Sequence, residues 1–328
     1  MAGTAGFIPV LHAATESRPD EIDTIVAAEA VAGALSRLGY TTEIIGLDRD
    51  LAGLENLPGR RPLLVFNLVD AVNGDGRLAP LVPARLDALG LAYTGAGTSA
   101  WLETLSKIGT KPKLAHAALP TPDWSEDGTG LDPNARVIVK AVWEHGSLGL
   151  DEASVMAGAE AGQAIAERNL RWKTEHFAEA FIEGREFNLA LLEVPSGVEV
   201  LPIAEIVFEG FDPGVPRIVG YDAKWAPDSQ AYIRTPRRFG LEQHEPQLAA
   251  ELARLALASW TLFRLRSYAR VDFRVDQAGA PQILEVNMNP CLSRDAGFAA
   301  AAAEAGLAYD AMVGRIVEAS FGRLQATA

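Results

Sequence analysis

The sequence predicts a soluble protein of several domains, with an α/β fold at the N-terminus followed by α+β folds. In the first hundred residues, short apolar runs alternate with segments of helical hydrophobic spacing, which is typical of parallel βα units. Near the C-terminus, residues 267–287 instead alternate apolar and polar side chains around a turn, as an antiparallel hairpin does. Because domains average about 150 residues, a chain of 328 residues predicts two or three of them.

The composition excludes several classes of protein. With 48% hydrophobic and 22% charged residues the chain is globular rather than disordered. Its 29 Lys+Arg against 43 Asp+Glu give a net charge of −14, which argues against nucleic-acid binding and against a polybasic membrane patch. No apolar run approaches a membrane span, and the N-terminus has neither the basic start nor the apolar core of an export signal, so we expect a cytoplasmic protein. The single Cys291 excludes an internal disulfide and a cysteine-based zinc site.

The N-terminal elements follow from apolar runs and from the glycines that end them. The pattern predicts strands at 7–11, 42–45 and 63–68, and helices at 22–38 and 78–89. Each helix stops before a glycine, Gly39 and Gly90. No GxGxxG motif follows the first strand and no GxxxxGK[ST] motif occurs, so the sequence favours neither a nicotinamide site nor a P-loop.

The middle of the chain places lysines and glycines where a phosphate could bind. Lys107 and Lys111 are four residues apart on a predicted helix, a spacing that a solvated basic face also explains. Lys140 ends a predicted strand at 136–140 and precedes a glycine-bearing loop, whose N–H groups could lie over phosphate. A further short strand is predicted at 179–182.

The hairpin near the C-terminus is the strongest local pattern. On its first strand Ala269, Val271, Phe273 and Val275 face one way, and Arg270, Asp272 and Arg274 face the other. On its second strand we expect Ile283, Glu285 and Asn287 to share one face, so that Glu285 and Asn287 meet Asp272. Two carboxylates and an amide oxygen predict a Mg²⁺ site that also holds nucleotide phosphates. An ordinary hairpin with a polar outer face is the alternative.

Taken together, these segments resemble the ATP-grasp carboxylate–amine ligases, most closely the D-alanine–D-alanine ligase group. The similarity covers nearly the whole chain and rests on VFNLVDAVNGDGRL, LGLAYTG, VIVK, FIEGREF, YDAKW, RVDFRVD and ILEVNMNP. The resemblance implies an ATP-grasp fold: an N-terminal α/β substrate domain at 1–102, a central ATP-grasp subdomain at 103–190, and a C-terminal subdomain with the metal site at 191–328. It also implies a homodimer that acts on small molecules.

The resemblance further implies a role for each matching residue. Lys111 and Lys140 would contact the phosphates of ATP and Lys224 its terminal phosphates, while Arg270 would stabilise the transition-state oxygens. The adenine pocket would be lined by Glu179, Ala180 and Ile182, and the ribose would contact Glu186. The ligands of Mg²⁺ (or Mn²⁺) would be Asp272, Glu285 and Asn287.

In this family a carboxylate attacks the γ-phosphate to give an acyl phosphate and ADP, and an amine then displaces phosphate. Positioning and charge neutralisation carry such chemistry. We therefore expect no nucleophilic side chain, and we expect Cys291 to fill a tight turn.

The amino-acid half departs from the family pattern. In the family, a glutamate binds the ammonium group of the first substrate and is linked through a serine to a tyrosine. In this sequence only Glu16 approximately matches that glutamate. The serine and tyrosine positions read Gly146, with Ser147 beside it, and Trp225, and a serine for the second substrate reads Ala296. Because unpaired buried polar groups cost roughly 1–3 kcal/mol each, we expect a substrate other than D-alanine.

The remaining substrate candidates are His145, Trp225 and Cys291, and for His145 and Trp225 loop packing is an equal alternative. Three other functions stay open: a true D-alanine–D-alanine ligase, an ATP-dependent small-molecule kinase, and a nucleotide-binding regulator without catalysis.

Overall fold

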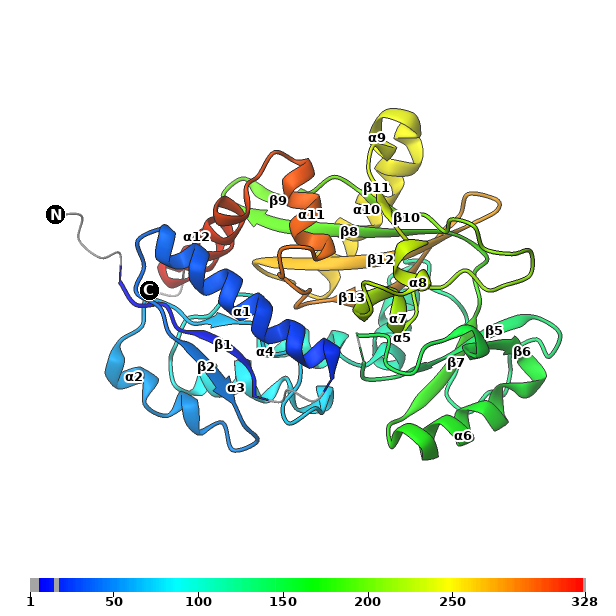
Figure 1. Ribbon diagram of the computed structural model, residues 1–328, viewed down its shortest axis with the longest axis horizontal. Coiled ribbons are helices and arrows are strands. Elements are labelled where there is room, and N and C mark those ends of the chain that lie inside the picture. Colours follow the sequence, from blue (N-terminus) through cyan, green and yellow to red (C-terminus); the bar gives the residue numbers. More distant parts are fainter. Residues whose placement is uncertain (1–5, 15–17, 145, 327–328) are drawn as a thin grey trace.

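The computed structural model describes residues 6–14, 18–144 and 146–326, with side chains as far as Phe321. Within this part of the chain, helices cover three β-sheets that follow one another along the long axis of the molecule (Figure 1). Among the described residues, no helix combines the length and the apolar character needed to cross a bilayer.

The first sheet is parallel and comes from the N-terminal segment. Its central strand β1 (Val10–Ala13) pairs with β2 (Ile44–Leu47) on one side and with β3 (Phe66–Asn67) on the other. The apolar run at 63–68 was predicted as a longer strand. In the structure only two residues pair with β1, and Val65 makes an isolated bridge to Tyr93.

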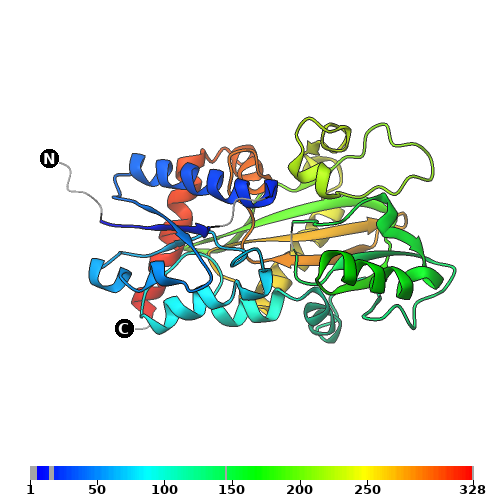
Figure 2. The same ribbon diagram turned by 60° about the horizontal axis from the view of Figure 1, so that its bottom comes forward.

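Helices cover both faces of this sheet (Figure 2). Helix α1 (Pro19–Arg37) packs through Ala28, Val31 and Leu35 on one face, and the other face is covered by α2 (Leu57–Arg60) and α3 (Leu81–Ala88). Proline at the first helical position is favourable because its φ is already helical and its missing N–H would have no intrahelical partner. The predicted helices at 22–38 and 78–89 are confirmed: each begins three residues from the predicted start and ends one residue before the predicted end.

The second sheet is antiparallel, with four strands in the order β4-β7-β5-β6. Its strands are β4 (Trp124–Ser125), β5 (Arg136–Ala141), β6 (Val155–Ala157) and β7 (His176–Ala180). Helix α6 (Ala161–Trp172) packs on this sheet through Ala161 and Ile165. Ahead of the sheet, α4 (Thr98–Thr104) and α5 (Lys107–His116) insert Trp101 and Leu114 into the core beneath the third sheet.

The third sheet is antiparallel and forms the floor of the C-terminal half. Its strands are β8 (Gly184–Val194), β9 (Gly197–Val200), β10 (Ala204–Ile206), β11 (Arg237–Arg238), β12 (Tyr268–Asp276) and β13 (Pro281–Asn287). The order is β11-β10-β8-β12-β13, with β9 paired to β8. Helix α10 (Pro246–Leu262) covers one face through Leu252 and Leu255. The short helices of this half are α7 (Tyr221–Trp225), α8 (Gln230–Ile233) and α9 (Leu241–His244).

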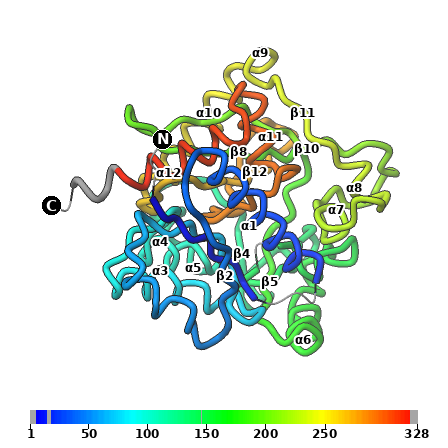
Figure 3. The backbone as a smooth tube through the Cα atoms, turned by 60° about the vertical axis from the view of Figure 1, so that its left-hand side comes forward, coloured from blue at the N-terminus to red at the C-terminus, as the bar shows by residue number. Residues whose placement is uncertain are grey.

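Strand β8 ties the third sheet to the N-terminal segment. Its Ala190 and Leu192 join the core formed by α1, α11 (Gly297–Glu304) and α12 (Tyr309–Ala326) (Figure 3). The predicted division of the chain after residue 190 falls inside this strand. All of β8 belongs to one sheet, so the change from the second sheet to the third comes before Gly184.

Candidate active site

Two adjoining cavities lie between the sheets. The smaller, with about 90 Å³ of accessible space, lies where β5 and β7 of the second sheet approach the hairpin β12–β13. The larger, with about 610 Å³, extends from this hairpin to the start of α1. The lining residues that both cavities share are Glu144, Glu186, Val219, Lys224 and Asp272.

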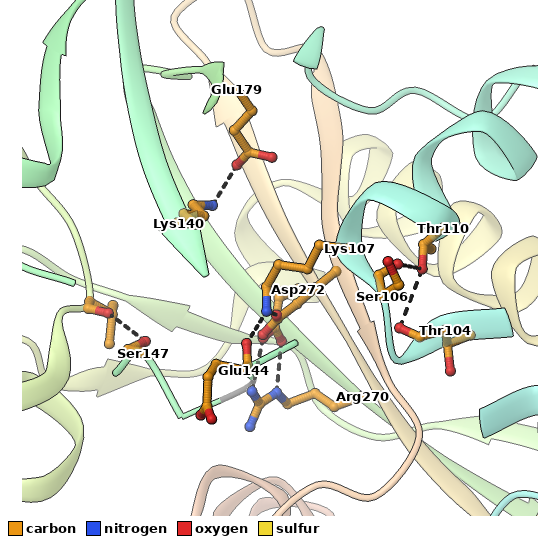
Figure 4. Close-up of polar contacts among 12 residues, drawn as sticks. Thr104, Ser106, Lys107, Thr110, Lys140, Glu144, Ser147, Glu179, Arg270 and Asp272 are labelled. Atoms are coloured by element: carbon orange, nitrogen blue, oxygen red, sulfur yellow. Dashed lines mark hydrogen bonds and ion pairs between the residues drawn. The ribbon is translucent and has the colours of Figure 1, made fainter. Parts of the chain in front are cut away.

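The alternation of β12 supplies the charged floor at this junction. Val271 and Phe273 enter the core, while Arg270 and Asp272 lie on the opposite face, as the sequence predicted. The Arg270 guanidinium donates to both Asp272 oxygens, Nε to Oδ1 at 2.7 Å and Nη2 to Oδ2 at 2.8 Å (Figure 4). Asn188 Nδ2 of β8 donates to the same Oδ1 at 2.9 Å. Burial alone would lower the pKa of Arg270, but the Asp272 carboxylate outweighs the effect of burial, and the pKa of Arg270 is raised.

The second strand of the hairpin places Glu285 opposite Asp272 and Asn287 opposite Arg270, so these residues share one face of the hairpin, as predicted. The prediction for Ile283 was wrong. A β-bulge between Asp272 and Phe273 leaves Leu284 without a partner, and Ile283 pairs with Phe273 and is fully buried in the core.

The oxygen donors at the hairpin suit a hard divalent cation. Two carboxylates, Asp272 and Glu285, and the Asn287 amide lie on one face, and oxygen ligands of this kind are those that Mg²⁺ takes. Among the described residues no three His, Cys, Asp or Glu side chains gather into a metal cluster.

Lys107, rather than Lys111, is the α5 lysine that reaches the smaller cavity. Its ammonium lies 3.2 Å from Glu285 Oε2 and donates to the Glu144 carbonyl (Figure 4). Lys111 lines neither cavity. It is 1% exposed and lies behind Glu179, 2.8 Å from that carboxylate, so the prediction that Lys111 contacts phosphate does not fit its position. One helical turn separates the two lysines, and only the first points into the cavity.

Glu179 holds two ammonium groups in place. Lys140 at the end of β5 pairs with one oxygen of Glu179 (Figure 4). Lys111 pairs with the other oxygen. Burial alone would raise the pKa of Glu179, but the two lysines outweigh it and lower that pKa, so the carboxylate is charged. Lys140 lines the cavity and is positioned to meet an anion there, while Lys111 completes the pair from behind.

The connection between the second and third sheets forms the apolar wall of the smaller cavity. Strand β7 ends at Ala180, earlier than predicted, and Ala180, Phe181 and Ile182 line the cavity before β8 begins. Glu186 of β8 lies at the junction, with Arg274 Nε 3.2 Å from its Oε2. Burial raises the pKa of Glu186 despite the nearby Arg274. This wall combines apolar contact with one partly buried acid, and a mostly apolar lining with a few polar groups is typical of small-molecule sites.

Carboxylates dominate the N-terminal side of the larger cavity. Asp20, Asp70 and Glu144 line it, and Arg18 pairs with Asp20 through two hydrogen bonds of 3.1 and 3.0 Å. Burial, strengthened by Asp20 and Asp70, raises the pKa of Glu144 to about 7. A cationic or ammonium-bearing group is therefore the natural occupant of this side.

The predicted substrate residues divide between the two cavities. Ser147 lines the smaller one and donates to the Val219 carbonyl at 3.2 Å, whereas Trp225 lines the larger one and donates to the Gly146 carbonyl at 2.7 Å. Glu16 and His145 lie outside the described residues.

Cys291 also contacts the N-terminal segment, which the expectation of a turn-filling residue did not include. Its Sγ lies 2.8 Å from Asp23 Oδ2 of α1, and the side chain lines the larger cavity. Burial and the Asp23 charge raise the pKa of Cys291, so the thiol stays protonated and is no nucleophile.

Two residues of the site were missed in the sequence. Asp70 follows a buried run at the carboxyl end of a parallel strand, a place where functional residues gather, so that signal was available. Glu144 carried no such signal, because it lies in an irregular segment and the charged groups around it, such as Arg18 and Asp70, are distant in the chain.

Comparison with known proteins shows similarity to D-alanine–D-alanine ligases in sequence and in fold. Residues 134–318 match the family model described as D-ala D-ala ligase C-terminus. The chain is 32% identical over 312 residues to a D-alanine–D-alanine ligase of Moorella thermoacetica, covering 90% of this chain and 93% of that protein. It is 31% identical over 306 residues to the uncharacterized protein y4sG of Sinorhizobium fredii, covering 90% and 88%. The crystal structure of D-alanine–D-alanine ligase from Bacillus anthracis complexed with ATP is similar with a TM-score of 0.75 at 20% identity, covering 99% of this chain and 100% of that one.

Proposed function

Because this chain belongs to the D-alanine–D-alanine ligase family and is an ATP-grasp ligase, we propose that it joins a carboxylate to an amine with formation of ADP, through an acyl phosphate, and that its substrate is not a pair of D-alanines. The observation that carries the proposal is the meeting of the two cavities at Lys224, Glu186 and Asp272. A nucleotide in one cavity and a carboxylate in the other would bring their reacting groups together there.

The smaller cavity supplies what a nucleotide needs. The wall at Ala180 and Ile182 would take the adenine, and Glu186 the ribose. Lys107, Lys140 and Lys224 would lie along the phosphates. Asp272, Glu285 and Asn287 would hold Mg²⁺, which when bound neutralises phosphate charge.

Transfer would begin when a substrate carboxylate oxygen attacks the γ-phosphorus and the bond to ADP breaks. An amine nitrogen would then attack the acyl carbon, inorganic phosphate would leave, and the amine would lose a proton. Arg270, held by Asp272, would stabilise the negative oxygens during both steps. No covalent intermediate with the protein is required.

The lining of the larger cavity argues for a substrate larger than D-alanine. Trp143, Trp225 and Tyr232 present aromatic surface to it, while Gly146 and Ala296 offer no hydroxyl. The Trp225 indole is already bonded to the Gly146 carbonyl, so this position closes the wall without offering the substrate a hydroxyl. A carboxylate with an apolar or aromatic part, together with an amine that the acidic side accepts, fits this lining best.

The test is release of ADP from Mg-ATP across panels of carboxylates and amines, followed by mass spectrometry of the product. We expect ADP release to require both partners, and D-alanine alone to give little phosphate. Efficient synthesis of D-alanyl-D-alanine would establish the true D-alanine–D-alanine ligase instead. ADP release with a carboxylate but without any amine dependence would indicate a kinase, and nucleotide binding without turnover on any panel would indicate a regulator.

We also propose that the enzyme acts in the cytoplasm, where ATP and amino acids are available, and as a homodimer through its N-terminal segment. Light scattering during size-exclusion chromatography tests the second point. A mass of one chain at micromolar concentration would contradict it.

A further inference from the structure

One hydrogen bond connects the start of α1 to the helix that carries Lys224. Tyr221 Oη donates to Asp20 Oδ1 at 2.7 Å, across 201 positions of sequence. Tyr221 is the first residue of α7, Asp20 lies in the first turn of α1, and the two helix ends face each other (Figure 1). Both Asp20 and Lys224 line the larger cavity, so this contact lies at the edge of the proposed substrate site.

The other side of the same segment is tied to the loop after β5. Tyr221 N donates to the Leu150 carbonyl at 3.1 Å, and Ser147 Oγ to the Val219 carbonyl at 3.2 Å. Gly220 lies so close to this loop that an added Cβ would come within 2.6 Å of the Leu150 oxygen. Segment 219–225 is therefore bonded to the second sheet on one side, and on the other side Asp20 ties it to the N-terminal segment.

The groups around this contact keep Tyr221 as the hydrogen-bond donor and Asp20 as the acceptor. Arg18 grips both oxygens of Asp20 and leaves Oδ1 available for the tyrosine as well. Burial, and then the bond to Asp20, raise the pKa of Tyr221, so its hydroxyl remains a donor at physiological pH. A donor of this kind to a charged, oriented carboxylate makes a strong hydrogen bond.

We propose that the Asp20–Tyr221 hydrogen bond is a positioning contact that fixes segment 219–225, and with it Lys224, against the substrate cavity. The inference rests on the proposed function and goes beyond it, because neither residue belongs to the serine–tyrosine link that the family resemblance implies. In this chain those positions are Gly146 and Trp225, and they bond through a backbone carbonyl instead. The tyrosine hydroxyl that reaches the N-terminal segment comes from the other end of α7.

The consequence is coupling between the two cavities. Lys224 lines both, and a substrate that settles against Asp20 would favour the arrangement in which Lys224 is ready for the phosphates. Breaking the contact should free segment 219–225 and weaken nucleotide binding, while the sheets and cores stay intact. One hydrogen bond to a charged group corresponds to about a tenfold change in such an equilibrium.

The test compares Tyr221→Phe, Asp20→Ala and their double variant with a matched control, Tyr93→Phe. Tyr93 also donates to an aspartate, Asp87 Oδ1 at 2.9 Å, but within the N-terminal segment and away from both cavities. Hydrogen exchange of peptides covering 219–225 measures the segment. Calorimetry with Mg²⁺ and an ATP analogue that has an imido group between the β- and γ-phosphorus measures nucleotide affinity.

We expect amide exchange in 219–225 to rise about tenfold in both single variants and no further in the double variant, because each removes the same contact. The analogue should bind several-fold more weakly to Tyr221→Phe, and Tyr93→Phe should match the parent protein in both measurements. Unchanged exchange in Tyr221→Phe, additive effects in the double variant, or equal loosening by Tyr93→Phe would each overturn the proposal. Failure of the parent protein to bind the analogue would refute the proposed function instead, and the exchange measurement would still decide whether the contact fixes the segment.

Discussion

Replacing Glu144 by glutamine should make the protein more stable at alkaline pH and leave it unchanged in acid. The side chain faces the larger cavity, where burial, Asp20 and Asp70 outweigh the attraction of Arg18 and Lys107. Its pKa in the folded protein is therefore raised from 4.5 to about 7. Glutamine has nearly the same shape and carries no charge to desolvate.

The magnitude follows from this shift. One pKa unit corresponds to about 1.4 kcal/mol, so the shift from 4.5 to about 7 means that a charged Glu144 destabilises the folded state by roughly 3 kcal/mol. Below the pKa that Glu144 has in the unfolded chain, its carboxyl is protonated in both the folded and the unfolded state, and the destabilisation vanishes. As pH rises from 4.5 towards 7 the unfolded chain loses its proton first, and the free energy of unfolding falls; above the folded pKa the cost is complete.

Urea unfolding followed by tryptophan fluorescence, at about pH 4.5 and about pH 8, measures the difference. We expect the free energy of unfolding of Glu144→Gln to exceed that of the parent by roughly 3 kcal/mol at the higher pH and by little at the lower. The matched control is Glu126→Gln, a change of the same chemistry at an exposed position. A gap between variant and parent that is equal at both pH values would refute the reasoning, because it would reflect packing and not ionisation.

Glu285→Gln should lose most turnover yet fold normally, because it removes charge from the cation ligands without creating a cavity; near-normal magnesium-dependent turnover would contradict the ligand assignment. Lys224→Met should weaken ATP more than the carboxylate substrate, and equal losses measured for both ligands would indicate misfolding. Lys111→Met should lower the unfolding free energy by roughly 3 kcal/mol, since it leaves buried Glu179 with one partner, and an unchanged urea midpoint would contradict that role. Trp225→Tyr combined with Gly146→Ser should raise D-alanine turnover relative to the native substrate in the ADP assay; an added Cβ at Gly146 meets its nearest neighbour at 3.7 Å, so the serine fits.

The hairpin shows how far pattern alone reaches. Strict alternation placed Arg270 and Asp272 on the open face because apolar side chains on one strand must share the core. The same rule failed for Ile283, since a bulge shifts the register by one residue and nothing in the local sequence marks it. The pairing of Ile283 with Phe273 on the neighbouring strand turned its side chain into the core.

The two lysines of α5 illustrate a second limit. Spacing placed both on the helix, but which one meets the cavity depends on how the helix is rotated against the sheets. Ser106 begins the helix by accepting from Gly109 N, and Lys107 then points at Glu285 while Lys111 points at Glu179. Contacts between segments separated by more than 60 residues set this rotation, and a single sequence does not contain them.

The division of the lining between the two cavities has a consequence for engineering. Among the described residues five line both cavities, so most of the wall around the proposed acyl and amine groups can be randomised without touching the nucleotide side. A mutant library at Ile22, Tyr232 and Ala296 would vary shape and polarity on the larger side alone. Selection from such a library should yield new amide-bond catalysts whose ATP affinity stays constant while their scope for coupling partners widens.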